Sequence, residues 1–148
     1  MTEPNSITIL LVDDSENDVL LMRRAFQGAS ASNSVQLARN GEEAVDYLKG
    51  EGRYGDRQLY PVPAVVLLDL KMPRKDGFEV LSWVRQQPVL KRLPIFILTA
   101  SCRPEDIERA FDLGANAYLV KPSTLEGLVE MVKCLNSWLN LNHFAPLP

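Results

Sequence analysis

The chain has 148 residues, which is room for one folded domain of ordinary size. Hydrophobic residues make up 46% and charged residues 24%, a composition that allows a buried core and excludes a disordered chain. The formal net charge of −3, from 16 basic and 19 acidic residues, is too small and too mixed for a nucleic-acid binder or a polybasic membrane binder. With no signal-peptide pattern, no apolar run of about 20 residues and too few cysteines for a disulfide framework, we expect a soluble cytoplasmic protein.

Short apolar runs alternate with helical patterns along the whole chain. Strands are expected at residues 7–12, 35–38, 64–68, 95–98 and 117–120. Helices are expected at residues 15–27, 42–49, 78–87, 104–113 and 123–140. Five strands that alternate with five helices require right-handed crossovers, so the predicted fold is α/β with a doubly wound, five-stranded parallel sheet covered on both faces.

The pattern divides the chain into an N-terminal arm (1–6), one domain (7–140) and an apolar C-terminal tail (141–148). One connection, residues 50–63, is near the length at which loops usually carry a function or are mobile. The apolar residues of the last helix and the tail allow two alternatives: they pack back on their own domain, or they form a homodimer or a docking surface for a partner protein. These residues are Trp138, Leu141, Phe144 and Leu147.

Reactive side chains follow four of the five predicted strands. Asp13 and Asp14 end the first strand, Asp69 the third, Thr99 the fourth and Lys121 the fifth. In open α/β sheets, ligands bind at the carboxyl ends of the strands, so we expect these side chains to share one site.

Three carboxylates at one edge must bind protons or a cation, because a pair about 4 Å apart repels by roughly 4 kcal/mol at an effective dielectric constant near 20. An all-oxygen site with few protein ligands suits Mg²⁺ or Mn²⁺. Zinc is disfavoured, because the chain has no Cys-x-x-Cys pair and its single histidine, His143, lies far off in the tail. Lys121 adds positive charge and Thr99 a hydroxyl donor.

The ordered set Asp13-Asp14, Leu-Leu-Asp69-Leu-Lys-Met-Pro73, Asp76-Gly77, Leu-Thr99-Ala100 and Lys121-Pro122 resembles the receiver domain of two-component response regulators. The match runs from about residue 7 to 139, and it implies the strand order 2-1-3-4-5 of flavodoxin-like receivers. The loop 50–63, the Leu-Lys-Arg-Leu-Pro94 segment, Ser137-Trp138 and the Pro-Leu-Pro ending are similar to the small response regulators of bacterial, cyanobacterial-type phytochrome kinases.

The resemblance implies that Asp69 accepts a phosphoryl group from a sensor histidine kinase of the phytochrome type, with a kinase of another type as the alternative partner. The docking alternative for the apolar tail would then concern this kinase. Asp14 and Asp69 would ligate the metal together with the backbone carbonyl of Lys71, and Asp13 would act through water. Lys121 would stabilise the charge on the transferring oxygens. The protein would then be a signalling domain that assists its own phosphorylation and dephosphorylation, and not an enzyme acting on external metabolites.

The resemblance also makes Thr99 and Tyr118 a switch pair, through which phosphorylation changes a surface that a downstream protein recognises. Without the resemblance, an aromatic residue on a strand, such as Tyr118, is more typically half-buried and only packs against its neighbours. Lys71 and Ser101 flank the route of water to the acyl phosphate, so we expect them to influence its lifetime.

Three further expectations concern the neighbourhood of the site and the last helix. The resemblance implies a cis Lys121–Pro122 bond, although the general rarity of cis bonds favours trans. Cys102 is interpreted as a small hydrophobe with a redox role as the alternative, and Cys134 as buried packing.

Two other functions use related folds. A Mg²⁺-dependent phosphatase with an aspartate nucleophile would carry an Asp-x-Asp motif, but Lys71 stands two residues after Asp69. A flavodoxin-like cofactor binder would need a Gly/Ser/Thr loop after the first strand, where this chain has the acidic sequence Asp-Asp-Ser-Glu. A phosphoacceptor domain is therefore the favoured hypothesis.

Overall fold

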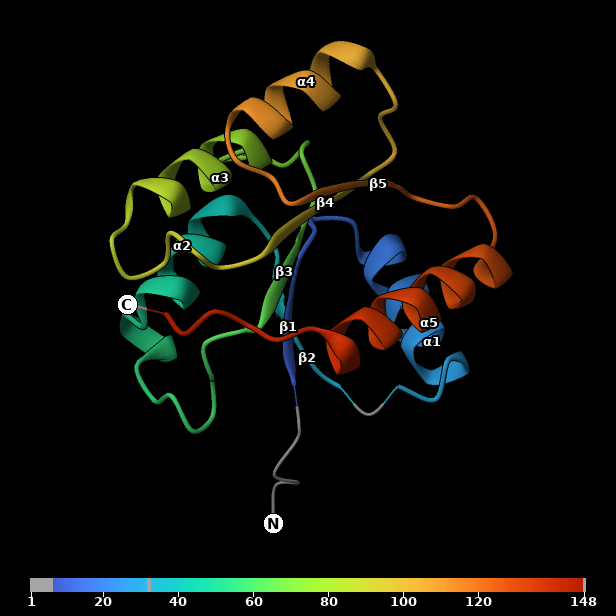
Figure 1. Ribbon diagram of the computed structural model, residues 1–148, viewed down its shortest axis with the longest axis horizontal. Coiled ribbons are helices and arrows are strands. Elements are labelled where there is room, and N and C mark those ends of the chain that lie inside the picture. Colours follow the sequence, from blue (N-terminus) through green and yellow to red (C-terminus); the bar gives the residue numbers. More distant parts are fainter. Residues whose placement is uncertain (1–6, 32, 148) are drawn as a thin grey trace.

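The computed structural model describes residues 7–31 and 33–147 (Figure 1). The predicted arm, residues 1–6, and the last residue of the tail lie outside the described part. The strands are β1 (Thr8–Val12), β2 (Ser34–Ala38), β3 (Val65–Leu68), β4 (Ile95–Thr99) and β5 (Ala117–Val120). The helices are α1 (Glu16–Gly28), α2 (Gly41–Lys49), the short 3₁₀ helix η1 (Gly52–Tyr54), α3 (Gly77–Gln86), α4 (Pro104–Asp112) and α5 (Leu125–Leu141).

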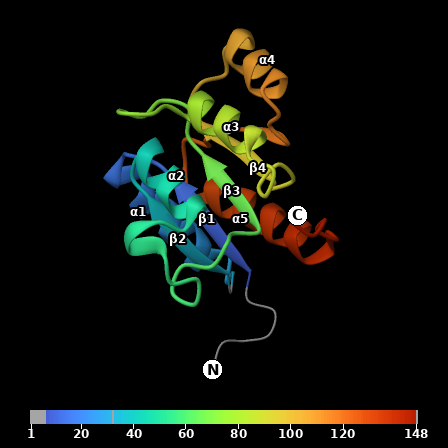
Figure 2. The same ribbon diagram turned by 90° about the vertical axis from the view of Figure 1, so that its left-hand side faces the viewer.

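All strand pairs are parallel, and the order across the sheet is β2-β1-β3-β4-β5. This confirms the predicted doubly wound α/β fold and its strand order. Helices α1 and α5 cover one face of the sheet, and α2, α3 and α4 lie on the other side (Figure 1). Figure 2 views the molecule from the side of α2 and α3.

The two central strands are buried on both faces, as their continuous apolar sequences predict. Successive side chains of a strand point to opposite faces. Ile9 and Leu11 of β1 therefore join the core under α1 and α5, whereas Leu10 and Val12 join the core under α2 and α3. After Thr8, every residue of β1 is apolar, and Asp13 follows directly, so the first carboxylate falls at the edge of the sheet.

Side-chain caps fix where α1, α2, α3 and α5 begin, close to the predicted boundaries. The Ser15 hydroxyl accepts a hydrogen bond from the Asp18 backbone N–H at 3.2 Å at the start of α1. The Asp76 carboxylate accepts one from the Glu79 N–H at 2.9 Å at the start of α3. Gly77 is required there, because a Cβ at this position would collide with the backbone oxygen of Asp69. The start of α3 is thus packed directly against the end of β3.

The loop 50–63 is packed by its own aromatic residues. The rings of Tyr47, Tyr54 and Tyr60 form three pairs with centroids 5.0, 5.9 and 5.1 Å apart. The Arg57 guanidinium donates hydrogen bonds to the carbonyl oxygens of Tyr47 (2.8 Å), Leu48 (2.9 Å) and Tyr60 (3.1 Å). The bonds to Tyr47 and Leu48 reach carbonyls in the last turn of α2, and the bond to Tyr60 ties the loop to the same guanidinium.

The tail turns back across the domain from α5 toward α2 (Figure 1). The Trp138 ring lies 4.9 Å from the Phe96 ring and 5.7 Å from the Phe144 ring. Leu147 packs against the core on the α2 and α3 side, whereas Leu141 is 79% exposed. Trp138, Phe144 and Leu147 therefore follow the first alternative, packing on their own domain, and Leu141 does not.

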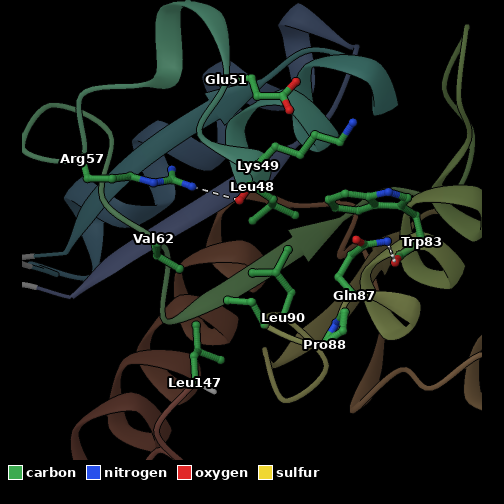
Figure 3. Close-up of a pocket in the computed structure, with 11 residues that line it drawn as sticks. Leu48, Lys49, Glu51, Arg57, Val62, Trp83, Gln87, Pro88, Leu90 and Leu147 are labelled. Carbon is green, nitrogen blue, oxygen red and sulfur yellow. Dashed lines mark hydrogen bonds between the residues drawn. The ribbon is translucent and has the colours of Figure 1, made fainter.

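Leu147 lines a groove of about 460 Å³ between α2 and α3, which we call the tail groove (Figure 3). Its apolar wall includes Leu48, Trp83 and Leu90, and the Lys49 and Arg57 side chains lie along it. Within the described residues, every helix is too short or too polar to cross a membrane.

Candidate functional site

Asp13, Asp69, Thr99 and Lys121 gather at the carboxyl edge of the sheet, because each ends or directly follows a strand. Asp13, Thr99 and Asp69 are buried, with 1%, 2% and 9% of their surface exposed. Asp14, one residue beyond Asp13, is exposed. The structure thus brings the predicted strand-end residues together, and it places hydrophilic groups where solvent screens them only partly.

The carboxylates of Asp13, Asp14 and Asp69 each offer an oxygen atom, and the three oxygens lie within 4.8 Å of one another. Oxygen donors at this density fit a hard divalent cation. Asp14 and the Lys71 residue line the same open hollow of about 460 Å³ beside the cluster. The donor set therefore fits the predicted metal, with space for water molecules to complete its coordination.

The Lys121 ammonium group contacts three carboxylates. Its Nζ atom donates to Asp13 Oδ2 at 2.8 Å, to Asp18 Oδ2 at 2.9 Å and to Asp69 Oδ2 at 3.4 Å. Burial lowers the pKa of Lys121, but the hydrogen bonds to Asp13 and Asp18 and the charge of Asp69 outweigh burial and raise this pKa above its usual value. Lys121 is therefore a fixed cation at this edge.

Asp13 is the most deeply buried member of the cluster. It accepts a hydrogen bond from the Ser15 backbone N–H at 3.0 Å as well as the bond from Lys121. Burial raises the pKa of Asp13, because the opposing effects of Lys121 and the Ser15 N–H are smaller than the cost of desolvating the carboxylate. A cation at the cluster would therefore offset an unfavourable charge.

Asp18 belongs to this site, although the sequence patterns assigned it only to the start of a helix. It lies in the first turn of α1 and reaches Lys121 across the site. The sequence signal was an acidic residue four positions after Asp14, which is equally typical of a charge that favours a helix N-terminus. Only the fold, which brings the first turn of α1 within reach of Lys121, distinguishes the two roles.

A second hollow, of about 410 Å³, opens over Asp69 on the side of β4, and we call it the acceptor hollow. Asp69, Thr99, Lys121 and Ser101 are among the residues that line it. The residues that line this hollow offer an anion attached to Asp69 the cationic side chains of Lys71, Arg103 and Lys121 and the hydroxyl groups of Thr99 and Ser101.

Hydrogen bonds hold the loop after β4 in place. The Ser101 hydroxyl donates to Asp106 at 2.6 Å, and the Tyr118 hydroxyl donates to the Ser101 carbonyl oxygen at 2.9 Å. Tyr118 is half-buried, and burial raises its pKa. The predicted switch residue is thus tied to the loop that borders the acceptor hollow.

Two expectations are wrong. The Lys121–Pro122 bond is trans, as are all peptide bonds of the described residues; trans is the lower-energy form by about 0.5–1 kcal/mol for such bonds. Cys134 is exposed and not buried, because the residues of α5 that reach the core are Leu128, Val132, Leu135 and Leu139. Cys102 is also exposed and lines the acceptor hollow.

This fold and site define a class of signalling protein. Residues 9–133 match the family model of the response regulator receiver domain. The chain therefore belongs to the response regulator receiver family.

One relative within the family is a cyanobacterial response regulator. The chain is 37% identical to Response regulator Rcp1 of Synechocystis sp. over 132 residues, which is 88% of both chains. The structure of the Mn²⁺-bound form of Rcp1 covers 94% of this chain and 99% of Rcp1 with a TM-score of 0.81 and 35% identity.

Two further solved structures are similar. The phosphorylated cyanobacterial phytochrome response regulator RcpA has a TM-score of 0.84 and 35% identity, covering 97% of this chain and 99% of RcpA. Response regulator RPA3017, from red light signaling of R. palustris, has a TM-score of 0.86 and 37% identity, covering 96% and 98%. The predicted resemblance to regulators of phytochrome kinases is thereby confirmed.

Proposed function

We propose that the protein accepts a phosphoryl group on Asp69 from a phytochrome-type sensor histidine kinase, in a Mg²⁺-dependent reaction. The observation that carries this proposal is the convergence of the carboxylate cluster and Lys121 on the Asp69 side chain. The phosphorylated form of RcpA, the Mn²⁺-bound form of Rcp1 and the red-light role of RPA3017 support it.

In the reaction, an Asp69 carboxylate oxygen attacks phosphorus. An O–P bond forms while the P–N bond to the kinase histidine breaks, and the imidazole leaves with the electron pair. Lys121 and the Thr99 hydroxyl would stabilise charge on the transferring oxygens. A divalent cation held by Asp14, Asp69 and the Lys71 carbonyl, and by Asp13 through water, would neutralise further charge.

Phosphorylation would then be transmitted through Thr99 and Tyr118. A phosphoryl group adds about −1.5 to −2 of charge and three acceptor oxygens, which attract the Thr99 hydroxyl. Movement of Thr99 would alter the packing of Tyr118 and its bond to the loop at Ser101. The changed surface would be recognised by a downstream protein or by a second copy of the chain, and Lys71 and Ser101 would tune the lifetime of the signal.

Labelling with acetyl phosphate tests the proposal. We expect the wild-type protein to gain base-labile, acid-stable phosphate with Mg²⁺ and none with EDTA. Asp69→Asn should gain none, whereas Asp112→Asn, which alters an exposed aspartate on α4, should label at the wild-type level. Wild-type labelling of Asp69→Asn would show that Asp69 is not the acceptor.

A further inference from the structure

We propose that Asp18 is a positioning residue for Lys121: it holds the ammonium group in the resting protein and competes for it with the phosphoryl oxygens. This inference rests on the proposed function of Asp69. It makes Asp18 a determinant of how readily the site accepts an anion, in addition to the metal ligands and the acceptor.

The hydrogen-bonding capacity of Lys121 is fully used. An ammonium group has three N–H donors and no acceptor. The three carboxylate partners of Lys121 Nζ lie at 2.8 Å (Asp13), 2.9 Å (Asp18) and 3.4 Å (Asp69). The longest contact is the one to the acceptor. Lys121 can therefore bind a phosphoryl oxygen only by weakening a contact that it already makes.

Asp18 is the partner most easily released. Its side chain is 39% exposed, against 1% for Asp13 and 12% for Asp69, so water can solvate the Asp18 carboxylate when Lys121 moves away. Asp13 would be left as a buried carboxylate with only the Ser15 N–H and no cation beside it, at a much higher cost. Asp18 also stands outside the cluster of oxygens that fits a metal ion. Release of Asp18 thus leaves the other partners in place.

Asp18 also lines the acceptor hollow together with Asp69, Thr99 and Lys121. An anion that enters this hollow therefore meets the Asp18 charge as well as Lys121. Both effects have the same sign: Asp18 occupies the cation and repels the incoming anion. Removal of the Asp18 charge should make anion binding tighter, which is the opposite of what removal of a merely structural residue would do.

Glu16 provides a matched control. It carries the same charge in the same first turn of α1, but its side chain is 88% exposed and pairs with Arg39 at 3.5 Å. Glu16→Gln and Asp18→Asn each remove one charge that favours the helix N-terminus, so their effects on α1 itself should be similar. Only Asp18→Asn removes a partner of Lys121.

The experiment is a calorimetric titration with beryllofluoride, an anionic phosphoryl mimic, at saturating Mg²⁺. We expect Asp18→Asn to lower the apparent Kd about fivefold, since the charge-assisted bond to Lys121 is partly exposed. Glu16→Gln should stay within about twofold of wild type, because a solvated charge is screened. Asp18→Glu, which restores a carboxylate, should return the apparent Kd most of the way to the wild-type value. Thermal melts check folding, and Asp18→Ser replaces Asp18→Asn if the latter is unfolded.

Unchanged or weaker binding by folded Asp18→Asn would overturn the inference, as would an equal gain in Glu16→Gln, which would indicate a general charge effect. Asp69→Asn separates the two proposals. If this variant binds beryllofluoride as wild type does, the proposed function fails. If it does not bind and Asp18→Asn equals wild type, only the role of Asp18 fails.

Discussion

The acceptor hollow and the tail groove have similar volumes, about 410 and 460 Å³, and opposite chemistry. The first lies where parallel strands end, and its walls carry charged groups from elements far apart in the sequence. The second lies between α2 and α3, and Leu48, Trp83, Leu90 and Leu147 form its apolar wall, with the Lys49 and Arg57 side chains along it (Figure 3). Apolar contacts in the groove stabilise the fold, whereas the crowded carboxylates of the acceptor site oppose it.

The difference shows how one small domain separates stability from reactivity. Burial of apolar surface contributes roughly 25 cal/mol per Å², and it does so without directional requirements. Buried carboxylates lose hydration, and they are tolerated here because Lys121 and a metal ion can balance them. Substitutions in the two regions should therefore respond differently to Mg²⁺.

Lys121→Met should change the free energy of unfolding more than any other substitution considered. It leaves Asp13 and Asp69 without their shared cation, so the free energy of unfolding in EDTA should fall by about 3 kcal/mol. Mg²⁺ should restore part of the loss by binding the same carboxylates. Urea denaturation with and without Mg²⁺ measures both. Lys133→Met, which removes an exposed ion pair with Glu130, should change the free energy of unfolding little. An equal loss in Lys133→Met would contradict the assignment of the loss to the buried carboxylates beside Lys121.

Phe144→Ala tests the tail region. The Phe144 ring packs edge-on against Trp138, with an interplanar angle of 90°. Its removal should cost about 1.5 kcal/mol, because Phe144 is half-buried. The loss should be the same with EDTA and with Mg²⁺, in contrast to Lys121→Met. Leu141→Ala, at a 79% exposed position, is the control and should be nearly neutral in the same urea denaturation.

Tyr47→Phe tests the aromatic cluster under the loop 50–63. The Tyr47 hydroxyl donates to the Pro61 carbonyl oxygen at 2.8 Å, so its removal should cost about 1 kcal/mol at pH 7. Burial raises the pKa of Tyr47 from 10.0 to about 12.

The pKa of Tyr47 also predicts a pH dependence. The stability that it contributes is fully present below pH 10 and is lost as the pH rises from 10 to about 12, because the unfolded tyrosine ionises first. Tyr47→Phe should therefore lose stability less steeply than wild type over this range, as measured by urea denaturation. If Tyr60→Phe flattens the curve equally, the effect does not belong to Tyr47.

Asp14→Asn should give the smallest change in the free energy of unfolding, and this change should be a gain and not a loss. Removal of one carboxylate from the cluster relieves repulsion, so the protein in EDTA should gain about 0.5 kcal/mol. The increase in Tm on addition of Mg²⁺ should shrink, because a ligand is lost. Asp56→Asn, at an exposed position in the loop, should leave the Mg²⁺-dependent increase unchanged. An undiminished increase in Asp14→Asn would place the metal elsewhere.

The sequence was sufficient to predict the elements and the strand-end residues of the site. Continuous apolar runs can be satisfied only inside a covered sheet, and polar residues directly after such runs must lie at its edge. Asp13, Asp69 and Lys121 were identified in this way without any knowledge of contacts. The exposed position of Cys134 was missed, because a short, weakly polar side chain does not mark which face of a helix it occupies.

By itself, the sequence determined the alternation of strands and helices and the residues that reach the carboxyl edge, because these depend on local periodicity. Tertiary structure decided that Asp18 joins Lys121, that the tail packs on its own domain through Phe144 and Leu147, and that Arg57 orders the loop. The Asp18–Lys121 and Leu147 contacts join segments distant in the chain, whereas the Trp138–Phe144 and Arg57–Tyr47 contacts join a helix to the segment that follows it. Their free energies depend on distance, burial and competing partners, and only the folded packing sets those quantities.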